Sequence, residues 1–373
     1  WADRVKPSQT QQLYGDAMEL IAEGQQEKAS GNDKQSRRAF KKAHKKLSRL
    51  LALSPRYTKA LTADVEVLLY LGRSADALKL LNKSPKTVAK NWKLKHLLGI
   101  HLFRAGKKKR GVRLLEQALR RDSGLFDAHY ILVGYYYKEN KCGKAIKHGT
   151  AYLRLRPKDP NIMGVIGNCH LKRKDLTAAT KAFERVLAWD PKNLPVRVNL
   201  GNIFFQKRQY NEAIAIYNQV LKSRTDLSPV HYNLAASYYA LERWTKAEQH
   251  FGESSRLEPK RASSHYFRGL SLVELDRPKQ AVGHLQKAAS LDRTDPWSLV
   301  ALAEISQHRK RLQEAADYAE SALKRAPRNE RILVLNGMIA RKRKLYAKAL
   351  QWYDRALASS PRNSMAYAER GFV

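Results

Sequence analysis

The stretch IMGVIGNCHLKRKDLTAATKAFERVLAWDPKN, residues 162–193, recurs in outline as LVLNGMIARKRKLYAKALQWYDRALASSPRN at residues 333–363. Aligning the two defines a frame of 34 residues that also fits the chain between them. Small residues hold the eighth position of the frame: Gly99, Gly167, Gly201, Ala235, Gly269, Ala303 and Gly337. Alanines hold the twentieth: Ala145, Ala179, Ala213, Ala247, Ala281, Ala315 and Ala349. Prolines close many repeats: Pro157, Pro191, Pro259, Pro327 and Pro361.

This spacing predicts two antiparallel helices in each repeat. Small residues at the eighth and twentieth positions let the two helices approach closely, and proline ends the second helix. A large side chain follows four residues after the twentieth position in most repeats: Leu115, Phe183, Tyr217, Phe251, Leu285 and Tyr353. Because one helix pair leaves an apolar face uncovered, the next pair must bury it. The sequence therefore predicts an all-α solenoid.

The pattern resembles the tetratricopeptide repeat (TPR) family, which implies a right-handed superhelical solenoid of antiparallel helix pairs. The resemblance covers residues 92–363 as eight repeats, beginning at Trp92, Phe126, Pro160, Leu194, Ser228, Ala262, Pro296 and Glu330. The chain departs from the family where His129, His231 and His265 replace the tryptophan near the start of the first helix. It departs again at Gly149 and Ala319, which stand where the large side chain is expected and put the packing there in doubt.

The two ends of the chain are less regular. Residues 1–57 are expected to form an irregular N-terminal helix pair around the turn SGND, and residues 58–91 a degenerate repeat with a second helix cut short near Pro85. Residues 364–373 are read as the first helix of a truncated further repeat, so we expect the array to continue beyond Val373. Since the chain starts at Trp1, we expect it to be a trimmed fragment.

Composition indicates a large core and an anionic partner. The 373 residues are 43% hydrophobic, and 71 Lys and Arg against 34 Asp and Glu leave a net charge of +37. Such a charge attracts an acidic protein, an anionic polymer or an acidic membrane surface. The two cysteines, Cys142 and Cys169, exclude a disulfide framework and do not reveal the compartment. From the resemblance we lean towards a bacterial cell envelope or periplasm, with the cytoplasm as the alternative.

Asparagines recur inside predicted helices, although their side chains compete for backbone hydrogen bonds there. In the TPR family the first helices line a concave groove, and the resemblance places four asparagines in it: Asn168, Asn199, Asn202 and Asn233. An amide both donates and accepts, so a column of amides can hold an extended peptide backbone. The expected flanking aromatic residues are Tyr130, Tyr137, Phe205, Tyr232, Tyr239 and Tyr266, with Trp297 as a further candidate. The alternative is that these tyrosines only pack neighbouring repeats together.

Basic runs occur at or after the end of the first helix in four repeats. They are Lys107, Lys108, Lys109 and Arg110; Lys172, Arg173 and Lys174; Arg309, Lys310 and Arg311; and Arg341, Lys342, Arg343 and Lys344. Cations near a helix C-terminus gain about 0.3–1 kcal/mol each from the helix dipole, which explains placement but not the excess charge. We therefore expect a basic edge for an anionic partner. Residues 37–50 form a basic amphipathic helix whose apolar stripe either packs on its neighbours or lies on a membrane.

No catalytic constellation or metal-ligand spacing is visible, so we expect neither an enzyme nor a cofactor. The histidine columns are expected to pack or cap. The first hypothesis is a scaffold that binds a peptide or protein segment and helps assemble a larger complex, such as a pilus, secretion or motility apparatus. The alternatives are binding of a polysaccharide or nucleic acid, and a substrate-selecting arm of a transferase. The two-carboxylate clamp of some TPR proteins is disfavoured by His96 and Ile100.

Overall fold

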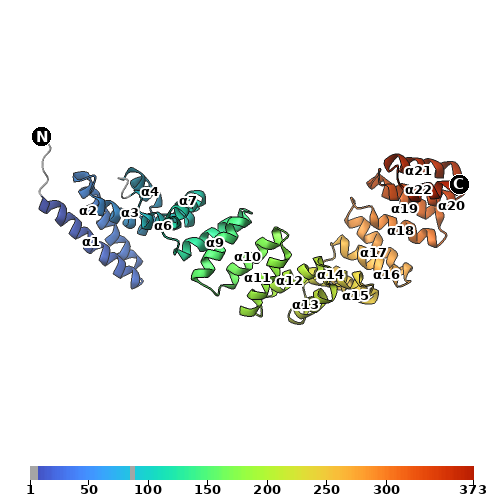
Figure 1. Cartoon of the computed structure of the whole chain (residues 1–373), viewed down its shortest axis with the longest axis horizontal. Helices are drawn as coiled ribbons and strands as arrows, with labels where there is room; N and C mark the ends of the chain where they lie inside the picture. The colour runs from blue at the N-terminus through green and yellow to red at the C-terminus, as the bar shows by residue number, and fades with distance from the viewer. Residues whose placement is uncertain (1–6, 85–88) are drawn as a thin grey trace. The chain divides into compact units, whose positions relative to one another are not determined.

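A computed structural model describes residues 7–84 and 89–373, so that Pro85 lies outside the described residues. The chain divides into two compact parts, Trp1–Trp189 and Asp190–Val373, here called the N-terminal and C-terminal bodies. Each is described by itself. Within the described residues the chain forms helices and turns without a strand, as Figure 1 shows. The prediction of an all-α solenoid of helix pairs is confirmed.

Helices follow one another in pairs along both bodies. The N-terminal body contains α1 (Pro7–Ala29), α2 (Asp33–Leu53), α3 (Thr58–Tyr70), α4 (Ser74–Lys83), α6 (Trp92–Arg104), α7 (Lys108–Leu119), α8 (Phe126–Lys138), α9 (Cys142–Leu155), α10 (Pro160–Lys172) and α11 (Leu176–Trp189). The C-terminal body contains α12 (Leu194–Gln206), α13 (Tyr210–Ser223), α14 (Ser228–Ala240), α15 (Trp244–Leu257), α16 (Ala262–Glu274), α17 (Pro278–Leu291), α18 (Trp297–His308), α19 (Leu312–Arg325), α20 (Glu330–Lys342), α21 (Tyr346–Ser359) and α22 (Ser364–Gly371).

Local chemistry explains where many of these helices begin and end. Side chains of Asn91, Asp159, Asn193, Asn329 and Asn363 accept hydrogen bonds from the first turns of α6, α10, α12, α20 and α22. The turn inside each repeat places one residue in the left-handed region. Seven such residues are not glycine, with φ between 53° and 62°: Asn140, Lys174, Arg208, Glu242, Asp276, Lys310 and Lys344. Such a residue ends the first helix by turning the chain out of the helical path.

The two helices of a repeat meet where a glycine faces a ring or a leucine. A Cβ added to Gly167 would lie 2.5 Å from the Phe183 ring, and one added to Gly201 would lie 2.7 Å from the Tyr217 ring. The alanines of the twentieth column are fully buried beside this contact. The glycines are therefore required for close approach of the helices.

Gly149 and Ala319, where packing was in doubt, are filled from neighbouring positions. In the repeat of Gly149, Val133 on α8 is fully buried, and Ile166 of the next repeat lies 2.9 Å from where a Gly149 Cβ would stand. Beside Ala319, the buried Asn336 donates hydrogen bonds to the carbonyls of Ala319 (3.2 Å) and Ile332 (2.9 Å).

The basic amphipathic helix α2 buries its apolar stripe within the N-terminal body. Phe40, Ala43, Leu47 and Leu50 belong to a core shared with α1 and α3. The Phe40 ring stacks on Tyr70 at 4.7 Å, and Lys46 pairs with Asp16 on α1. This stripe is therefore covered by protein. No helix among the described residues has the length and apolar character needed to cross a bilayer.

Cys142 and Cys169 lie in one buried cluster of the N-terminal body with Leu132 and Tyr136. Both are free thiols. Burial, and hydrogen bonding to Cys142, raise the pKa of Cys169 to about 12, so that its thiol stays protonated.

Candidate binding surface and basic edges

Two of the four predicted asparagines are hydrogen-bonded to each other. In the C-terminal body, Asn233 on α14 donates from Nδ2 to Oδ1 of Asn202 on α12 at 2.8 Å. The Tyr217 hydroxyl donates to the same Oδ1 at 2.7 Å. Burial raises the pKa of Tyr217, which keeps this hydroxyl protonated. The two amides therefore join neighbouring repeats. This is a structural role, which the prediction of a ligand-binding column did not include.

The remaining asparagines are half-buried. Asn199 lies on α12 with Asn202, whereas Asn168 lies on α10 of the N-terminal body. The position of Asn168 relative to the other three is not determined, because it belongs to the other body. The structure thus brings Asn202 and Asn233 together and leaves a four-residue column as a prediction.

Aromatic residues of α14, α15 and α16 form one cluster beside these amides. The Phe267 ring lies 6.2 Å from Tyr232 and 5.7 Å from Tyr239, centroid to centroid, and Trp244 meets Tyr239 at 4.8 Å. Burial raises the pKa of Tyr266, next to Phe267, to about 12. Phe205 packs on Tyr210 at 5.4 Å and reaches the same core. These rings are half-buried, so they pack repeats together and still expose part of their faces.

In the N-terminal body the predicted tyrosines are less enclosed. Tyr130 is 51% exposed and lies 5.8 Å from the Tyr152 ring. The Lys172 ammonium lies 4.7 Å from the centre of the Tyr137 ring and donates to Oδ1 of Asn140 at 3.2 Å. In the C-terminal body, the guanidinium of Arg331 likewise lies 5.4 Å from the Trp297 ring. With Arg261, which lies 5.4 Å from the Tyr232 ring, cations cover three of the predicted aromatic faces.

One basic run is placed differently from the prediction. Lys107 precedes α7, and Lys108, Lys109 and Arg110 form its first turn instead of following the end of a helix. At a helix N-terminus the dipole disfavours cations, so it cannot explain this run. The four exposed side chains line a hollow of about 560 Å³ together with Tyr135 and Glu139. The prediction that all runs lie at the end of a first helix or in the turn after it is wrong for Lys108, Lys109 and Arg110, which belong to the second helix.

The other three runs lie where first helices end. Lys172, Arg173 and Lys174 close α10, and Arg309 to Arg311 bridge α18 and α19. At the end of α20, Arg341 donates to Glu369 at 3.1 Å and Arg343 donates to Gln313 at 2.6 Å. Because Gln313 follows the 309–311 turn, the last two runs lie on one edge of the C-terminal body.

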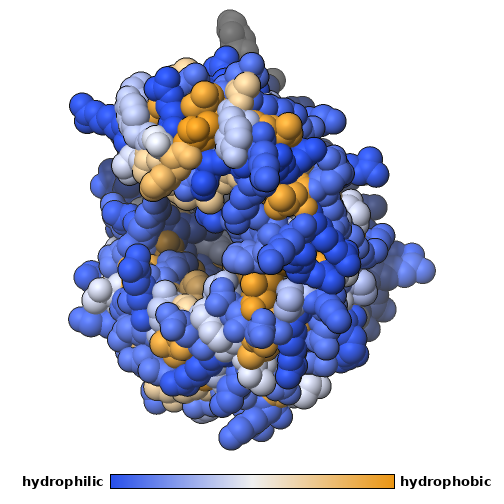
Figure 2. All heavy atoms as spheres, turned by 90° about the vertical axis from the view of Figure 1, so that its right-hand side faces the viewer, coloured by the Kyte–Doolittle hydropathy of each residue, from blue (hydrophilic) through white to orange (hydrophobic). Residues whose placement is uncertain are grey.

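Figure 2 views the molecule from the side that carries the C-terminus, where hydrophilic side chains surround separate apolar patches. The exposed apolar residues at this end include Leu345, Tyr346, Met365, Tyr367 and Phe372. Met365 and Tyr367 lie on α22, which packs on α20 and α21.

The histidine columns pair across the two helices of a repeat. His129 and His148 are joined through their Nδ1 atoms at 3.0 Å, and His231 and His250 at 3.2 Å. His129 Nε2 must donate to the Ser123 carbonyl (3.3 Å), so its Nδ1 accepts a hydrogen bond from Nδ1–H of His148. Burial lowers the pKa of His148 and of His250 to about 4, which keeps the pairs neutral. Among the described residues no group of His, Cys, Asp and Glu is placed to hold a metal ion.

His265 and His284 repeat the arrangement more loosely, with ring centres 6.0 Å apart. Sequence reasoning had placed His129, His231 and His265 in one column and missed that each faces a second histidine. It also missed Phe267 and Trp244, which complete the aromatic cluster. The signal was present, because the three pairs share one spacing within the repeat.

Comparisons with known proteins agree with this fold. The family model of the Cilia and flagella-associated protein 70 C-terminal domain matches residues 138–370, and a tetratricopeptide repeat model matches residues 96–160. No curated protein matches the chain.

Solved structures of TPR proteins resemble parts of the chain at low identity. The C-terminal part of a TPR repeat-containing protein from Cytophaga hutchinsonii is 18% identical with a TM-score of 0.56, over 64% of this chain and 97% of that one. PilF of Pseudomonas aeruginosa is 20% identical with a TM-score of 0.49, over 57% and 97%. YrrB, described as a TPR protein with an unusual peptide-binding site, is 21% identical with a TM-score of 0.46, over 52% and 100%.

Proposed function

We propose that this chain is a scaffold that binds an extended protein segment. The chain belongs to the tetratricopeptide repeat family, and residues 138–370 belong to the family of the cilia and flagella-associated protein 70 C-terminal domain. An array of this family is a protein-interaction scaffold, a fold typical of proteins without catalysis. The segment is held by the first helices of the C-terminal body. We call Asn202, Asn233, Tyr232, Tyr239 and Phe267 the first-helix surface.

The observation that carries this proposal is the Asn202–Asn233 amide pair. Oδ1 of Asn202 already accepts two hydrogen bonds, so this residue offers a bound chain only the N–H donors of its Nδ2. Asn233 uses a donor in the pair and keeps its carbonyl oxygen as an acceptor. A donor and an acceptor side by side match the C=O and N–H groups of an extended backbone.

The aromatic residues supply the apolar part of this surface. The Phe267 ring packs on Tyr232 at 6.2 Å and on Tyr239 at 5.7 Å, centroid to centroid. Because these rings are already packed, little side-chain entropy remains to be lost on binding. Rigid rings beside amides favour a segment with apolar side chains and a free backbone. Arg261 lies over the Tyr232 ring at 5.4 Å, where its Nε donates to Glu258 at 2.8 Å.

The test uses peptides selected from a random display library against the full chain. Isothermal titration then compares wild type with Asn202→Ala, Asn233→Ala and Tyr239→Ala. Each is expected to weaken a selected peptide by about tenfold, the cost of one or two lost hydrogen bonds or ring contacts.

The matched control is Asn218→Ala, which removes an asparagine of the same body from the second helix α13. It should leave the affinity unchanged. If the selected peptides bind the first-helix variants as tightly as wild type, the proposed surface is wrong.

A second candidate function is binding of an anionic partner along the N-terminal body. The observation favouring it is the run Lys107–Arg110, where exposed cations open a helix against its dipole and thus serve no local stability. The extended charge suits an acidic protein segment or an anionic polymer.

Retention on heparin and on polyglutamate, measured against salt, tests this candidate. Replacing Lys108, Lys109 and Arg110 with Gln should lower the salt needed for elution while leaving α7 intact, because the dipole repulsion is relieved. The control replaces the equally exposed Lys41, Lys42 and Lys45 of α2 with Gln. Equal loss in both variants would show a general charge effect and refute a specific edge.

A further inference from the structure

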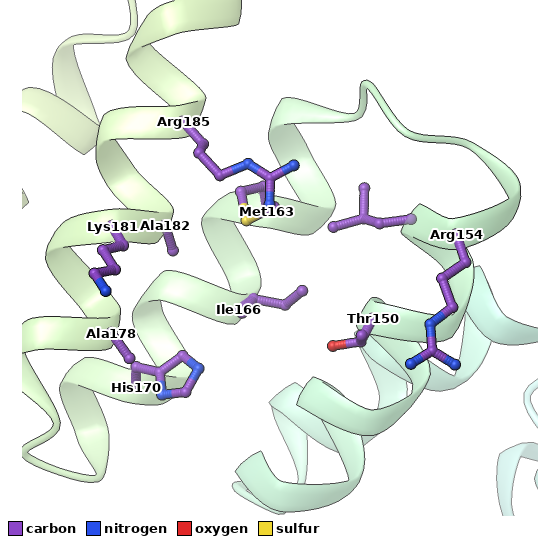
Figure 3. A pocket seen from close by; sticks show the side chains of 10 residues that line it. Thr150, Arg154, Met163, Ile166, His170, Ala178, Lys181, Ala182 and Arg185 are labelled. Atoms are coloured by element: carbon purple, nitrogen blue, oxygen red, sulfur yellow. The ribbon is translucent and has the colours of Figure 1, made fainter.

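A pocket of about 430 Å³ opens between α9, α10 and α11, wholly within the N-terminal body. Its floor is apolar and includes Met163, Ile166 and Ala182, all of them buried. Its rim carries Arg154 from α9 and Lys181 and Arg185 from α11. Figure 3 shows the two sets of cations on opposite sides, with Met163 and Ile166 between them. This size lies within the range of small-molecule sites.

Ala182, on the α11 side of the pocket, is small at a position that is otherwise filled. Ala182 is the 23rd residue of its repeat, and the other seven repeats place a large side chain there: Leu114, His148, Ile216, His250, His284, Tyr318 and Trp352. One repeat earlier, His148 fills this place by bonding to His129 and stacking on Tyr136 at 5.7 Å. The counterparts of His129 and Tyr136 are Met163 and His170, which line the pocket instead.

The charge at the rim has no protein counterpart. None of the ten lining residues is acidic. In the part of the chain that the structure describes, neither Arg154 nor Lys181 forms an ion pair, and Arg185 lies 5.3 Å from the Trp189 ring. The carboxylate of Asp175 pairs with His170, at 3.3 Å from its Nδ1. Three cations facing one apolar hollow repel one another, and a bound anion relieves that repulsion.

The C-terminal body contains an equivalent hollow that lacks these features. It lies between α17, α18 and α19 and measures about 530 Å³. Tyr318 takes the place of Ala182 there and accepts a hydrogen bond from Gln286 at 3.0 Å. The counterparts of the three rim cations are Ser290, Asp317 and Ser321. Two other arginines line this hollow, Arg293 and Arg325, and Arg325 donates to the carbonyls of Ala289, Asp292 and Asp295. The hollow alone is therefore a feature of the repeat, whereas the missing ring and the three cations are particular to the pocket around Ala182.

We propose that the Ala182 pocket binds a small amphipathic anion, with its carboxylate or phosphate held by Arg154, Lys181 and Arg185 and its apolar body on Met163 and Ile166. Guanidinium groups match the oxygen geometry of both anions. The pocket uses α9, α10 and α11 of the N-terminal body, whereas the first-helix surface uses first helices of the C-terminal body. The two sites are independent, so either stands if the other fails.

Isothermal titration of the full chain with octanoate and with octyl phosphate tests the proposal. Acetate supplies the charge without the apolar body, and 1-octanol supplies the apolar body without the charge. Octanoate or octyl phosphate should bind about tenfold or more tightly than either control compound. The tighter of the two probes identifies the head group.

Two sets of variants locate the site. Ala182→Tyr, which copies the side chain at Tyr318, should abolish binding by filling the pocket. Arg154→Ser with Arg185→Ser copies the other hollow and should weaken the anion about tenfold while leaving 1-octanol unchanged. These two surface changes do not touch the core, so they keep the test valid if Ala182→Tyr fails to fold.

The matched control is Tyr318→Ala, which enlarges the hollow of the C-terminal body. The three rim cations have no basic counterpart there and Arg325 is held by backbone carbonyls, so this variant should add no anion site. Three outcomes would overturn the proposal. They are no binding of either probe at millimolar concentration, equal binding of 1-octanol, and binding that survives loss of both arginines.

Discussion

The repeats at 126–155 and 330–359 fill the contact between their two helices from opposite sides. In the second, Gly337 on α20 lies under the fully buried Tyr353 ring of α21. In the first, the fully buried Val133 on α8 stands in the place of Gly337, and Gly149 on α9 stands in the place of Tyr353. Close packing therefore limits the side-chain volume between the two helices of a repeat. Either helix can supply the larger side chain.

The same two repeats differ in a second contact. His129 and His148 stand where the later repeat has Leu333 and Trp352. The histidines can replace an apolar pair because the Ser123 carbonyl and the two Nδ1 atoms satisfy their hydrogen bonds. This exchange leaves the earlier repeat with a contact that depends on pH.

The largest effect is expected where the glycine lies under a ring. Gly337→Leu should lower the free energy of unfolding by about 3 kcal/mol, because its side chain must displace the Tyr353 ring. Urea unfolding followed by circular dichroism measures this. Gly283→Ala on α17, where a Cβ meets no atom within 4 Å, is the control and should stabilise by about 1 kcal/mol. A tolerated leucine would mean that the two helices do not need close approach.

In the repeat at 126–155, Gly149→Ala should lower the free energy of unfolding by about 1–3 kcal/mol, because the new Cβ overlaps the Ile166 side chain. Ile166→Val alone should cost about 0.5–1.5 kcal/mol. Together they should cost less than the sum, because valine lacks the methyl group that meets the new Cβ. Additive costs in this double-mutant cycle would show that the two sites are not coupled.

The histidine pairs make the earlier type of repeat sensitive to acid. The folded pKa of His148 and of His250, about 4, lies below the ordinary 6.5, so protons favour the unfolded chain. Stability should be complete above pH 6.5 and fall as the pH approaches 4, by on the order of 1 kcal/mol for each pair after screening by water. The charged and titratable neighbours are His129, Glu116, Lys144 and Lys147 for His148, and His231, Glu253 and Lys246 for His250.

Thermal melts between pH 7 and pH 4.5 measure this dependence. His148→Leu with His250→Leu should flatten it, since Leu114 holds the same position in the first repeat. An unchanged slope in the double variant would assign the acid sensitivity to other groups.

The smallest effect concerns the turns of the two repeats. Lys344→Gly should stabilise by about 1 kcal/mol, because lysine at a φ of 62° carries a steric cost that glycine avoids. Asn140→Gly, at a φ of 56°, should gain less, since asparagine tolerates this region. A larger gain at Asn140 than at Lys344 would contradict this explanation.

The fold could be predicted because its determinants are local and periodic. Each small residue, alanine and proline recurs at one spacing, and asparagine or aspartate caps at Asn91, Asp159 and Asn193 mark helix starts. A one-residue error in the frame would misplace every column at once, so the repeats support one another. The TPR family was identified from these columns alone, and the family comparisons confirm it.

The site was less accessible to sequence reasoning because it depends on neighbours from other helices. The asparagine column was visible, but the bonds of Asn202 to Tyr217 and Asn233 require knowledge of how α12, α13 and α14 meet. The pocket at Ala182 has a small side chain where the other repeats have a large one, which composition and motif searches do not detect. Comparing the 23rd residue across repeats would have found it.

The reactivity of the two buried cysteines reports on local opening of the N-terminal body. Cys142 and Cys169 are the only thiols in the sequence, and both are shielded in the cluster around Leu132 and Tyr136. A thiol-reactive reagent can modify them only while that cluster is transiently exposed. The labelling rate of the unaltered chain therefore measures how often these repeats separate, without any engineered probe.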